Sequence, residues 1–210
     1  AQGVSTLNMK LLRTTGIPES TLIEKIEPAT EKEHHCTIGY YPSYYGVDIR
    51  ITSDAQATLS RLSSEISDIL GHSIYAVNKI DIAEVAVGLA VEKGATFAAA
   101  ESCTGGLIGH RITEVSGSSK AFLGGVVAYS NDVKQKGLGV QSSTLEKYGA
   151  VSAETAEEMA ENILSKFQAD YGISVTGIAG PTGDTEDKPV GIVYIGLAKK
   201  GTVKVKKLQF

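Results

Sequence analysis

The sequence lacks the features that mark secreted, membrane-spanning and nucleic-acid-binding proteins. Its two cysteines, Cys36 and Cys103, can form neither a disulfide framework nor a four-thiolate metal site. No apolar run approaches the roughly 18–20 residues of a membrane span, and the first residues do not resemble a signal peptide. The formal net charge of −4 gives no electrostatic reason to expect nucleic acid or a membrane as partner. These absences predict a cytoplasmic protein in a reducing compartment.

The chain is long enough for one large domain or two small ones, since 42% of its 210 residues are hydrophobic. A change in the sequence pattern near residue 78 favours two domains, which we place at residues 1–78 and 79–210. The sequence starts with Ala1 and not with an initiator Met, so we expect a piece of a longer protein.

Residues 1–78 have the pattern of a small α+β domain. Val47, Ile49 and Ile51 alternate with polar residues, as in a half-buried strand. Pro18 opens one helix, and Asp54 is expected to cap a second. Strands are expected at residues 7–14, 37–41, 47–52 and 73–77.

From residue 79 onward, apolar strands and amphipathic helices alternate. This order predicts an α/β fold, a three-layer α/β/α sandwich with a mainly parallel sheet and an antiparallel edge. Strands are expected at residues 96–100, 124–129, 172–175, 190–198 and 202–210, and helices at 81–94, 107–115 and 152–167.

The turn Glu101-Ser102-Cys103-Thr104-Gly105-Gly106 follows the first of these buried strands. The carboxyl edge of such a sheet is where α/β proteins bind ligands, and the two glycines let backbone come close to one. The helix behind the turn would offer free N–H groups to an anion, with phosphate as the natural guest. The alternative is an ordinary helix start with Thr104 as its cap. Cys103 would have a lowered thiol pKa at this helix end and is a competing nucleophile.

Ser119, Tyr129 and Lys134 form a second candidate set. A serine hydroxyl needs a base to remove its proton, and a lysine can be that base only when burial or a nearby cation lowers its pKa from about 10.4. A tyrosine can relay or orient the proton. The alternative is that Ser119 caps a turn, Tyr129 ends a strand and Lys134 is a solvated helix charge.

The segment Thr176-Gly177-Ile178-Ala179-Gly180-Pro181 opens a long loop that ends at Lys188-Pro189. It follows a buried strand, and its small residues would let it wrap a ligand closely. A plain surface connection is the alternative. In His34-His35-Cys36 the candidate ligands are adjacent and not spaced, which favours an exposed loop over a metal site.

Taken together and in this order, the motifs resemble the CinA family. Residues 80–210 resemble its C-terminal domain, and residues 7–78 resemble its KH-like middle segment. The motifs that carry the resemblance are Ala99-Ala100-Glu101-Ser102-Cys103-Thr104-Gly105-Gly106, Gly117-Ser118-Ser119, Tyr129-Ser130-Asn131 with Lys134, Gly149-Ala150-Val151-Ser152, Thr176-Gly177-Ile178-Ala179-Gly180-Pro181 with Lys188-Pro189-Val190-Gly191, Leu12-Arg13-Thr14-Thr15-Gly16-Ile17 and Gly39-Tyr40-Tyr41-Pro42-Ser43.

The resemblance implies an amidohydrolase of pyridine nucleotide salvage, which converts nicotinamide mononucleotide to nicotinic acid mononucleotide and ammonia. It implies Ser119 as nucleophile, Lys134 as base and Tyr129 as a proton relay. No metal or organic cofactor is implied. The substrate-binding residues that it implies are Ser102, Thr104, Gly105, Gly106, Thr176, Gly177 and Gly180.

Two other functions compete with this one. A non-catalytic nucleotide-binding or regulatory fragment would use the same turns, with Ser119 and Lys134 incidental. Nucleic-acid binding by residues 1–78 is disfavoured, because they hold six Lys/Arg against nine Asp/Glu and no GxxG loop. The resemblance also implies a homodimer, a preceding domain like those of molybdopterin-biosynthesis proteins, and an arginine past Phe210 that would bind the substrate phosphate.

Overall fold

The computed structural model describes residues 7–210 and divides the chain into two compact units. Unit 1 comprises Ala1–Val85 and unit 2 comprises Ala86–Phe210. The division falls within helix α3 (Ile82–Glu92), a little beyond the boundary expected after residue 78. Among the described residues, no helix is both long and apolar enough to cross a lipid bilayer.

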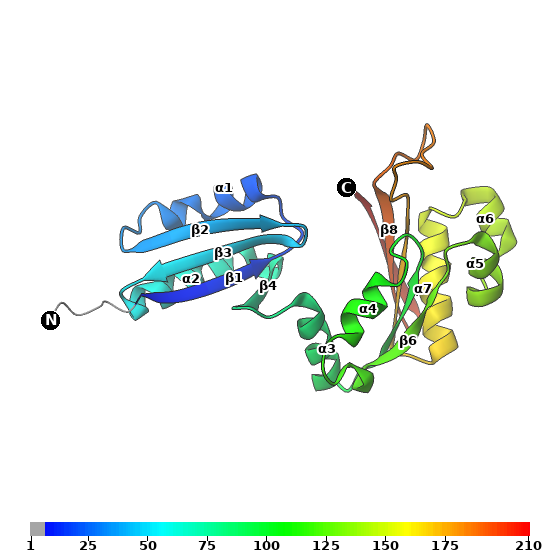
Figure 1. Ribbon diagram of the computed structural model, residues 1–210, viewed down its shortest axis with the longest axis horizontal. Coiled ribbons are helices and arrows are strands. Elements are labelled where there is room, and N and C mark those ends of the chain that lie inside the picture. Colours follow the sequence, from blue (N-terminus) through cyan, green and yellow to red (C-terminus); the bar gives the residue numbers. More distant parts are fainter. Residues whose placement is uncertain (1–6) are drawn as a thin grey trace. The chain divides into compact units, whose positions relative to one another are not determined.

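Unit 1 contains an antiparallel four-stranded sheet in the order β2-β3-β1-β4, with two helices (Figure 1). This arrangement is the small α+β domain that the sequence predicted. Its elements are β1 (Asn8–Thr14), α1 (Glu19–Thr30), β2 (Cys36–Ser43), β3 (Gly46–Ser53), α2 (Gln56–Leu70), the 3-10 turn η1 (Gly71–Ser73) and β4 (Ile74–Val77).

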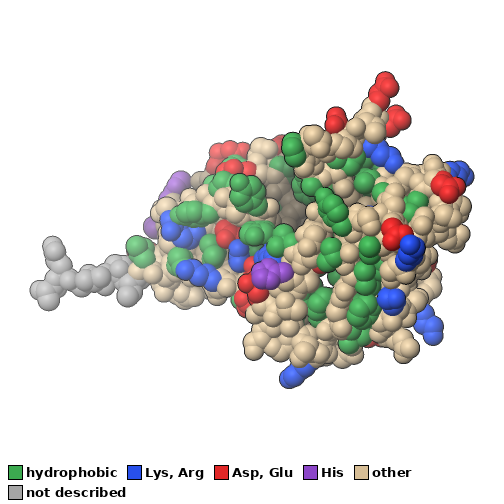
Figure 2. Space-filling view, turned by 45° about the vertical axis from the view of Figure 1, so that its right-hand side comes forward, with side chains coloured by type: hydrophobic (Ala, Val, Ile, Leu, Met, Phe, Trp, Pro, Cys, Tyr) green, Lys and Arg blue, Asp and Glu red, His purple; other side chains and the backbone are tan. Residues whose placement is uncertain are grey.

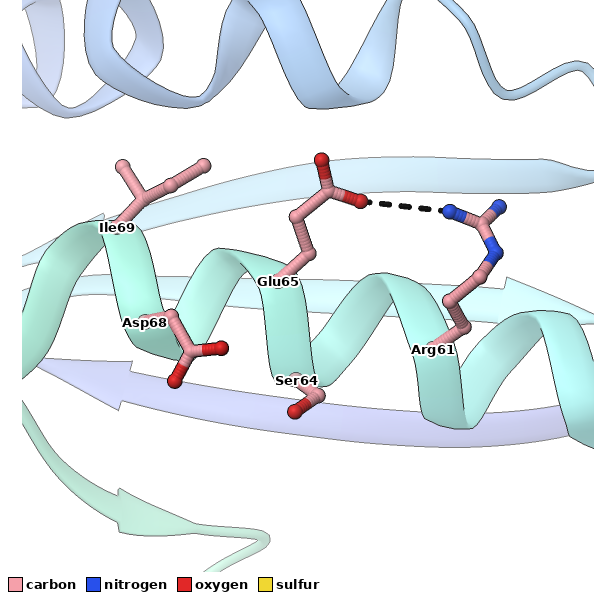
Figure 3. Close-up of a pocket in the computed structure, with 5 residues that line it drawn as sticks. All are labelled: Arg61, Ser64, Glu65, Asp68 and Ile69. Atoms are coloured by element: carbon pink, nitrogen blue, oxygen red, sulfur yellow. Dashed lines mark hydrogen bonds and ion pairs between the residues drawn. The ribbon is translucent and has the colours of Figure 1, made fainter.

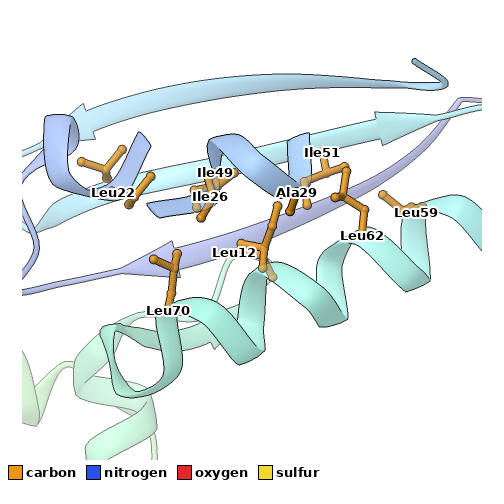
Figure 4. Packing of buried hydrophobic residues seen from close by; sticks show 11 residues of the cluster. Leu12, Leu22, Ile26, Ala29, Ile49, Ile51, Leu59, Leu62 and Leu70 are labelled. Carbon is orange, nitrogen blue, oxygen red and sulfur yellow. The ribbon is translucent and has the colours of Figure 1, made fainter. Parts of the chain in front are cut away.

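The core of unit 1 lies between its sheet and its two helices (Figure 4). Ile49 and Ile51 of β3 are buried against apolar side chains of α1 and α2, so the predicted alternation is confirmed. The predicted cap of α2 is wrong. Asp54 makes no capping bond, and the hydroxyl of Ser53 accepts the N–H of Ala55 at 3.1 Å instead.

Unit 2 contains a five-stranded sheet in the order β6-β5-β7-β8-β9. β6, β5 and β7 are parallel, whereas β8 and β9 extend the sheet antiparallel, as the sequence predicted. After α3, the elements are β5 (Phe97–Glu101), α4 (Leu107–Thr113), the 3-10 turn η2 (Ser118–Lys120), β6 (Phe122–Val127), α5 (Asn131–Leu138), α6 (Ser142–Tyr148), α7 (Ala153–Phe167), β7 (Tyr171–Gly177), β8 (Ile192–Lys199) and β9 (Thr202–Gln209).

Helices cover both faces of the parallel strands, which gives the three layers expected. On one face, Ala98 of β5 packs in a cluster with Met159 of α7. On the other face, Phe97 packs with Val87 of α3 and Ile112 of α4. Because successive residues of a strand point to opposite faces, β5 sends alternate side chains to two different helix layers.

The short helices α5 and α6 have no counterpart among the predicted elements. α5 is mainly polar, so no apolar stripe marks it in the sequence. Ser130 caps it by accepting the N–H of Val133 at 3.2 Å, and Gly139 ends it with a φ of 77°. This helix, which the sequence raised only as the alternative to a catalytic Lys134, carries that lysine.

Candidate active site

A buried lysine lies at the carboxyl edge of the parallel strands. Lys134 is only 1% exposed. Its side-chain nitrogen Nζ lies 2.8 Å from the hydroxyl oxygen of Ser102 and 2.8 Å from the carbonyl oxygen of Ala128. Both partners are uncharged, so neither compensates a positive charge on the lysine.

Burial lowers the pKa of Lys134, because loss of water disfavours the charged ammonium. Ionisation of the nearby Cys103 would raise the pKa of Lys134 and is the smaller of the two causes. A lowered pKa increases the fraction of unprotonated amine, which is the form that can accept a proton. The alternative of a solvated helix charge is therefore excluded for Lys134.

Ser102 is fixed where β5 ends. Its backbone N–H donates to the carbonyl oxygen of Val175 in β7 at 2.9 Å, and its own carbonyl oxygen accepts the N–H of Gly105 at 3.1 Å. Strand alternation sends the Ser102 side chain to the face of Ala98, which is the face covered by α5, α6 and α7. This is why its hydroxyl meets Lys134.

The N-terminus of α4 is not open to an anion, because Glu101 fills it. The Glu101 side chain is buried, and its Oε2 accepts the Thr104 hydroxyl at 2.7 Å and the N–H groups of Gly106 and Ile108 at 3.1 and 3.0 Å. Its Oε1 accepts the N–H of Gly109 at 2.8 Å. The prediction that these N–H groups bind phosphate is therefore wrong.

Cys103 is a free, half-buried thiol beside the pair. Burial raises its pKa, and this outweighs the lowering by backbone hydrogen bonds and by Lys134. The sequence-based expectation of a lowered thiol pKa is therefore wrong. A raised pKa leaves less thiolate, which makes Cys103 a weaker competitor for the role of nucleophile.

The structure does not bring Ser119 to Lys134. Ser119 is exposed in η2, directly before β6, and the neighbouring Ala121 carbonyl accepts the N–H of Phe97 at the start of β5. Ser119 thus lies at the amino edge of the sheet, whereas Lys134 lies at the carboxyl edge. At about 3.3 Å per residue, the strand between them spans roughly 13–17 Å.

Tyr129 does lie at the edge that carries Lys134. It follows Ala128, whose carbonyl oxygen binds Lys134, and its side chain is 76% exposed. Of the predicted set, Tyr129 and Lys134 are therefore brought to one edge, with Ser102 in the place expected for Ser119.

Three residues predicted to bind substrate lie in β7 and the loop that follows it, where they make packing contacts or hydrogen bonds. Thr176 is fully buried and donates its hydroxyl to the Ala150 carbonyl oxygen at 2.7 Å. A side chain at Gly177 would lie 2.7 Å from a carbonyl oxygen of β8, and one at Gly180 would lie 2.6 Å from Val190. Substrate contact by these residues stays a prediction.

The loop between β7 and β8 is tied down by one lysine near its end. The Lys188 ammonium donates to the carbonyl oxygen of Tyr148, the last residue of α6, at 2.6 Å. Exposed Asp184, Glu186 and Asp187 precede it, and acidic side chains gather at the tip of this loop in the space-filling view (Figure 2).

Unit 1 has two surface hollows that offer fewer candidate functional groups than the site in unit 2. The hollow along α2 is lined by successive turns of that helix, where Arg61 and Glu65 form an ion pair at 3.3 Å (Figure 3). His34, His35 and Cys36 border another hollow, but no cluster of metal-binding side chains is found within residues 7–210.

Comparison with known proteins covers both units. Residues 79–210 match the family model described as the CinA C-terminal domain, and residues 9–76 match the model of the damage-inducible protein CinA KH domain. A CinA-like protein from Kosmotoga olearia is 44% identical over 209 residues, which cover 97% of this chain and 51% of that protein. The chain thus spans about half the length of the curated relatives it matches.

Solved structures agree with the family match. A competence/damage inducible protein from Agrobacterium tumefaciens aligns with a TM-score of 0.60 at 40% identity, covering 61% of this chain and 78% of that one. The competence damage-inducible protein A from Klebsiella pneumoniae aligns with a TM-score of 0.59 at 34% identity, covering 61% and 79%.

Proposed function

The chain belongs to the CinA family, and we propose that its unit 2 is an amidohydrolase with Ser102 as nucleophile and Lys134 as base. The observation that carries the proposal is the 2.8 Å contact between a buried lysine amine and a serine hydroxyl. Serine–lysine pairs are a recurring alternative to the Ser-His-Asp triad. Ser102 takes the role first assigned to Ser119, because only Ser102 lies within reach of the base.

The reaction has two halves that share one base. Unprotonated Lys134 accepts the Ser102 proton while Oγ attacks the amide carbon, and it returns that proton to the leaving nitrogen as the C–N bond breaks. Ammonia leaves, and an acyl ester remains on Ser102. Water then attacks this ester and passes a proton to Lys134, which hands it to the departing Ser102 oxygen. The acid is released, and Lys134 ends unprotonated.

The oxyanion of the tetrahedral intermediate needs N–H donors. The Ser102 N–H donates to β7, the Gly105 N–H donates to the Ser102 carbonyl, and the Gly106 N–H donates to Glu101. These amides are already used. The backbone N–H groups of Cys103 and Thr104, which interact with the Cys103 sulfur, are the remaining candidates in this turn.

As substrate we propose nicotinamide mononucleotide, with nicotinic acid mononucleotide and ammonia as products. The family resemblance supports this choice, and Tyr129, exposed at the same edge of the sheet, keeps its proposed role in proton transfer. Since the N-terminus of α4 is filled, the substrate phosphate is bound by other groups. We propose Lys188 for that role, a lysine in the loop that follows β7 whose ammonium donates to the Tyr148 carbonyl oxygen.

An ammonia-release assay with nicotinamide mononucleotide tests the proposal. We expect turnover by the wild type, and a loss of about 10³-fold or more in Ser102→Ala and in Lys134→Met, because each removes a member of a pair that acts as a unit. Ser119→Ala distinguishes the two assignments of the nucleophile and should retain turnover.

Two outcomes would contradict the assignment. Full turnover by Ser102→Ala would remove Ser102 from the chemistry. Thermal stabilisation by the mononucleotide without any ammonia release would instead favour the non-catalytic nucleotide-binding alternative.

A further inference from the structure

Glu101 is connected to both halves of the Ser102–Lys134 pair. Its backbone carbonyl oxygen accepts the N–H of Ala128 at 2.7 Å, and the Ala128 carbonyl oxygen accepts Lys134 Nζ at 2.8 Å. The next residue along the chain, Ser102, closes the ring through its own 2.8 Å bond to Lys134. Any shift of Glu101 therefore moves the nucleophile and the support of the base together.

The Glu101 side chain fixes the turn that follows the nucleophile. It is 3% exposed and accepts four hydrogen bonds, three on Oε2 and one on Oε1. All four donors come from the segment between Thr104 and Gly109. An amide could not replace this carboxylate without loss, because its NH₂ group would face N–H donors. Bonds to an ionised acceptor are also the stronger ones.

The carboxylate does not share a face with the reacting atoms. Glu101 and Ser102 are consecutive, so their side chains point to opposite faces of the sheet. The Glu101 carboxylate lies on the α4 face, and the Ser102 hydroxyl lies on the α5 face with Lys134. Any influence of Glu101 on the pair therefore has to pass through the backbone, because its carboxylate does not contact Ser102 Oγ or Lys134 Nζ.

We propose that Glu101 is a positioning residue, whose buried carboxylate holds the Ser102 hydroxyl in contact with Lys134. The inference rests on the proposed function for its catalytic meaning, but the contact itself can be observed without any turnover.

The test compares two acid-to-amide changes at opposite edges of the same sheet. Glu101→Gln disturbs the turn. Asp170→Asn is the matched control, because the Asp170 carboxylate accepts the N–H and hydroxyl of Thr96 at 2.7 and 2.9 Å, away from the pair. Three quantities are measured in the full chain: the rate of Ser102 labelling by diisopropyl fluorophosphate, kcat and KM for nicotinamide mononucleotide, and the Lys134–Ser102 distance in a crystal structure.

In Glu101→Gln we expect labelling and kcat to fall about 10- to 100-fold with KM little changed, since a displacement of about 1 Å can cost this much. The crystal structure should show the Lys134–Ser102 contact broken. Asp170→Asn should label and turn over like the wild type. An intact contact with wild-type labelling in Glu101→Gln would overturn the proposal.

A second variant tests the proposal in case Glu101→Gln does not fold. Glu101→Asp keeps the charge but is one methylene shorter, and it should label at an intermediate rate. Wild-type labelling by Glu101→Asp, or unfolding of both variants, would overturn the positioning role. If the wild type is labelled but releases no ammonia, the amidase proposal fails, while the labelling rates and the crystal contact still decide the role of Glu101.

Discussion

At the scale of single residues, the chemistry depends on the burial of Lys134. An exposed lysine has a pKa of about 10.4 and stays protonated in neutral solution. Lys134 is 1% exposed between two uncharged acceptors, so its pKa is lowered and its amine can act as a base. The amino-acid sequence names this lysine but does not show its burial, because burial is a property of α5 and the strands beneath it.

The activity should follow the ionisation of Lys134. Only the unprotonated amine accepts the Ser102 proton, so kcat/KM should rise with pH through the lowered pKa and level off below about 10.4, the value of an exposed lysine. A pH–rate profile of ammonia release measures this directly. An inflection at the value of an exposed lysine would contradict the role assigned to burial.

The stability should also depend on this group. The unfolded chain holds a lysine of pKa about 10.4, whereas burial lowers the pKa of Lys134 in the folded chain. Between these two values the unfolded chain binds more protons, so the free energy of unfolding of the wild type should rise with pH. Denaturant unfolding at several pH values measures the slope. Lys134→Met should lose this contribution, and an equal slope in both proteins would contradict it.

At the scale of elements, the direction of each strand decides which residues can meet. Ser102 and Lys134 each follow a parallel strand, so both lie at the carboxyl edge. Ser119 follows the crossover helix α4 and precedes β6, which places it at the amino edge. The predicted order of strands and helices implies the same placement. It puts Ser102 and Lys134 at the carboxyl edge of the sheet and Ser119 at the amino edge.

The regular elements could be predicted because their apolar residues are periodic. β5, β7 and α7 were expected close to their observed bounds, and Ser152 caps α7 by accepting the N–H of Thr155 at 3.1 Å. The polar helices α5 and α6 have no such signal. The part of the site that depends on them, including the burial of Lys134, could therefore not be read from the sequence.

Close packing of α7 on β7 should depend on one glycine. A side chain at Gly172 would lie 2.1 Å from the Ala160 carbonyl oxygen, so Gly172→Ala should destabilise unit 2 by about 1–3 kcal/mol or more. Gly88→Ala is the control, since this α3 position has open space and should gain up to about 1 kcal/mol. Thermal unfolding compares the two. Equal stability of both variants would contradict the predicted clash.

The loop between β7 and β8 should loosen when its lysine contact is removed. Lys188→Met keeps the length of the side chain but loses the 2.6 Å bond to the Tyr148 carbonyl. We expect faster proteolysis within residues 178–189 at an unchanged unfolding temperature, because exposed loops are cleaved when they move freely. Unchanged cleavage would show that other contacts hold the loop.

At the scale of the whole molecule, the chain is built from two units with separate hydrophobic cores. The core of unit 1 contains Ile49, and one core of unit 2 contains Met159; both side chains are fully buried. A unit with its own core can in general fold by itself. The resemblance to two family models, one for each unit, agrees with this division.

The two units should therefore unfold in separate steps. Ile49→Ala should lower only the transition of unit 1, and Met159→Ala only that of unit 2, each by about 2–5 kcal/mol from the cavity it leaves. Differential scanning calorimetry measures both transitions in the same chain. A single transition that shifts with either substitution would contradict independent folding.

The Glu101 side chain occupies the N-terminus of α4, and this matters for the design of inhibitors. A compound that carries a phosphate, sulfonate or carboxylate toward that turn would be repelled by the buried Glu101 carboxylate. This carboxylate already accepts the N–H groups that would otherwise bind the anion. A neutral electrophile directed at Ser102, with any anionic group pointed toward the loop that holds Lys188, suits the site better.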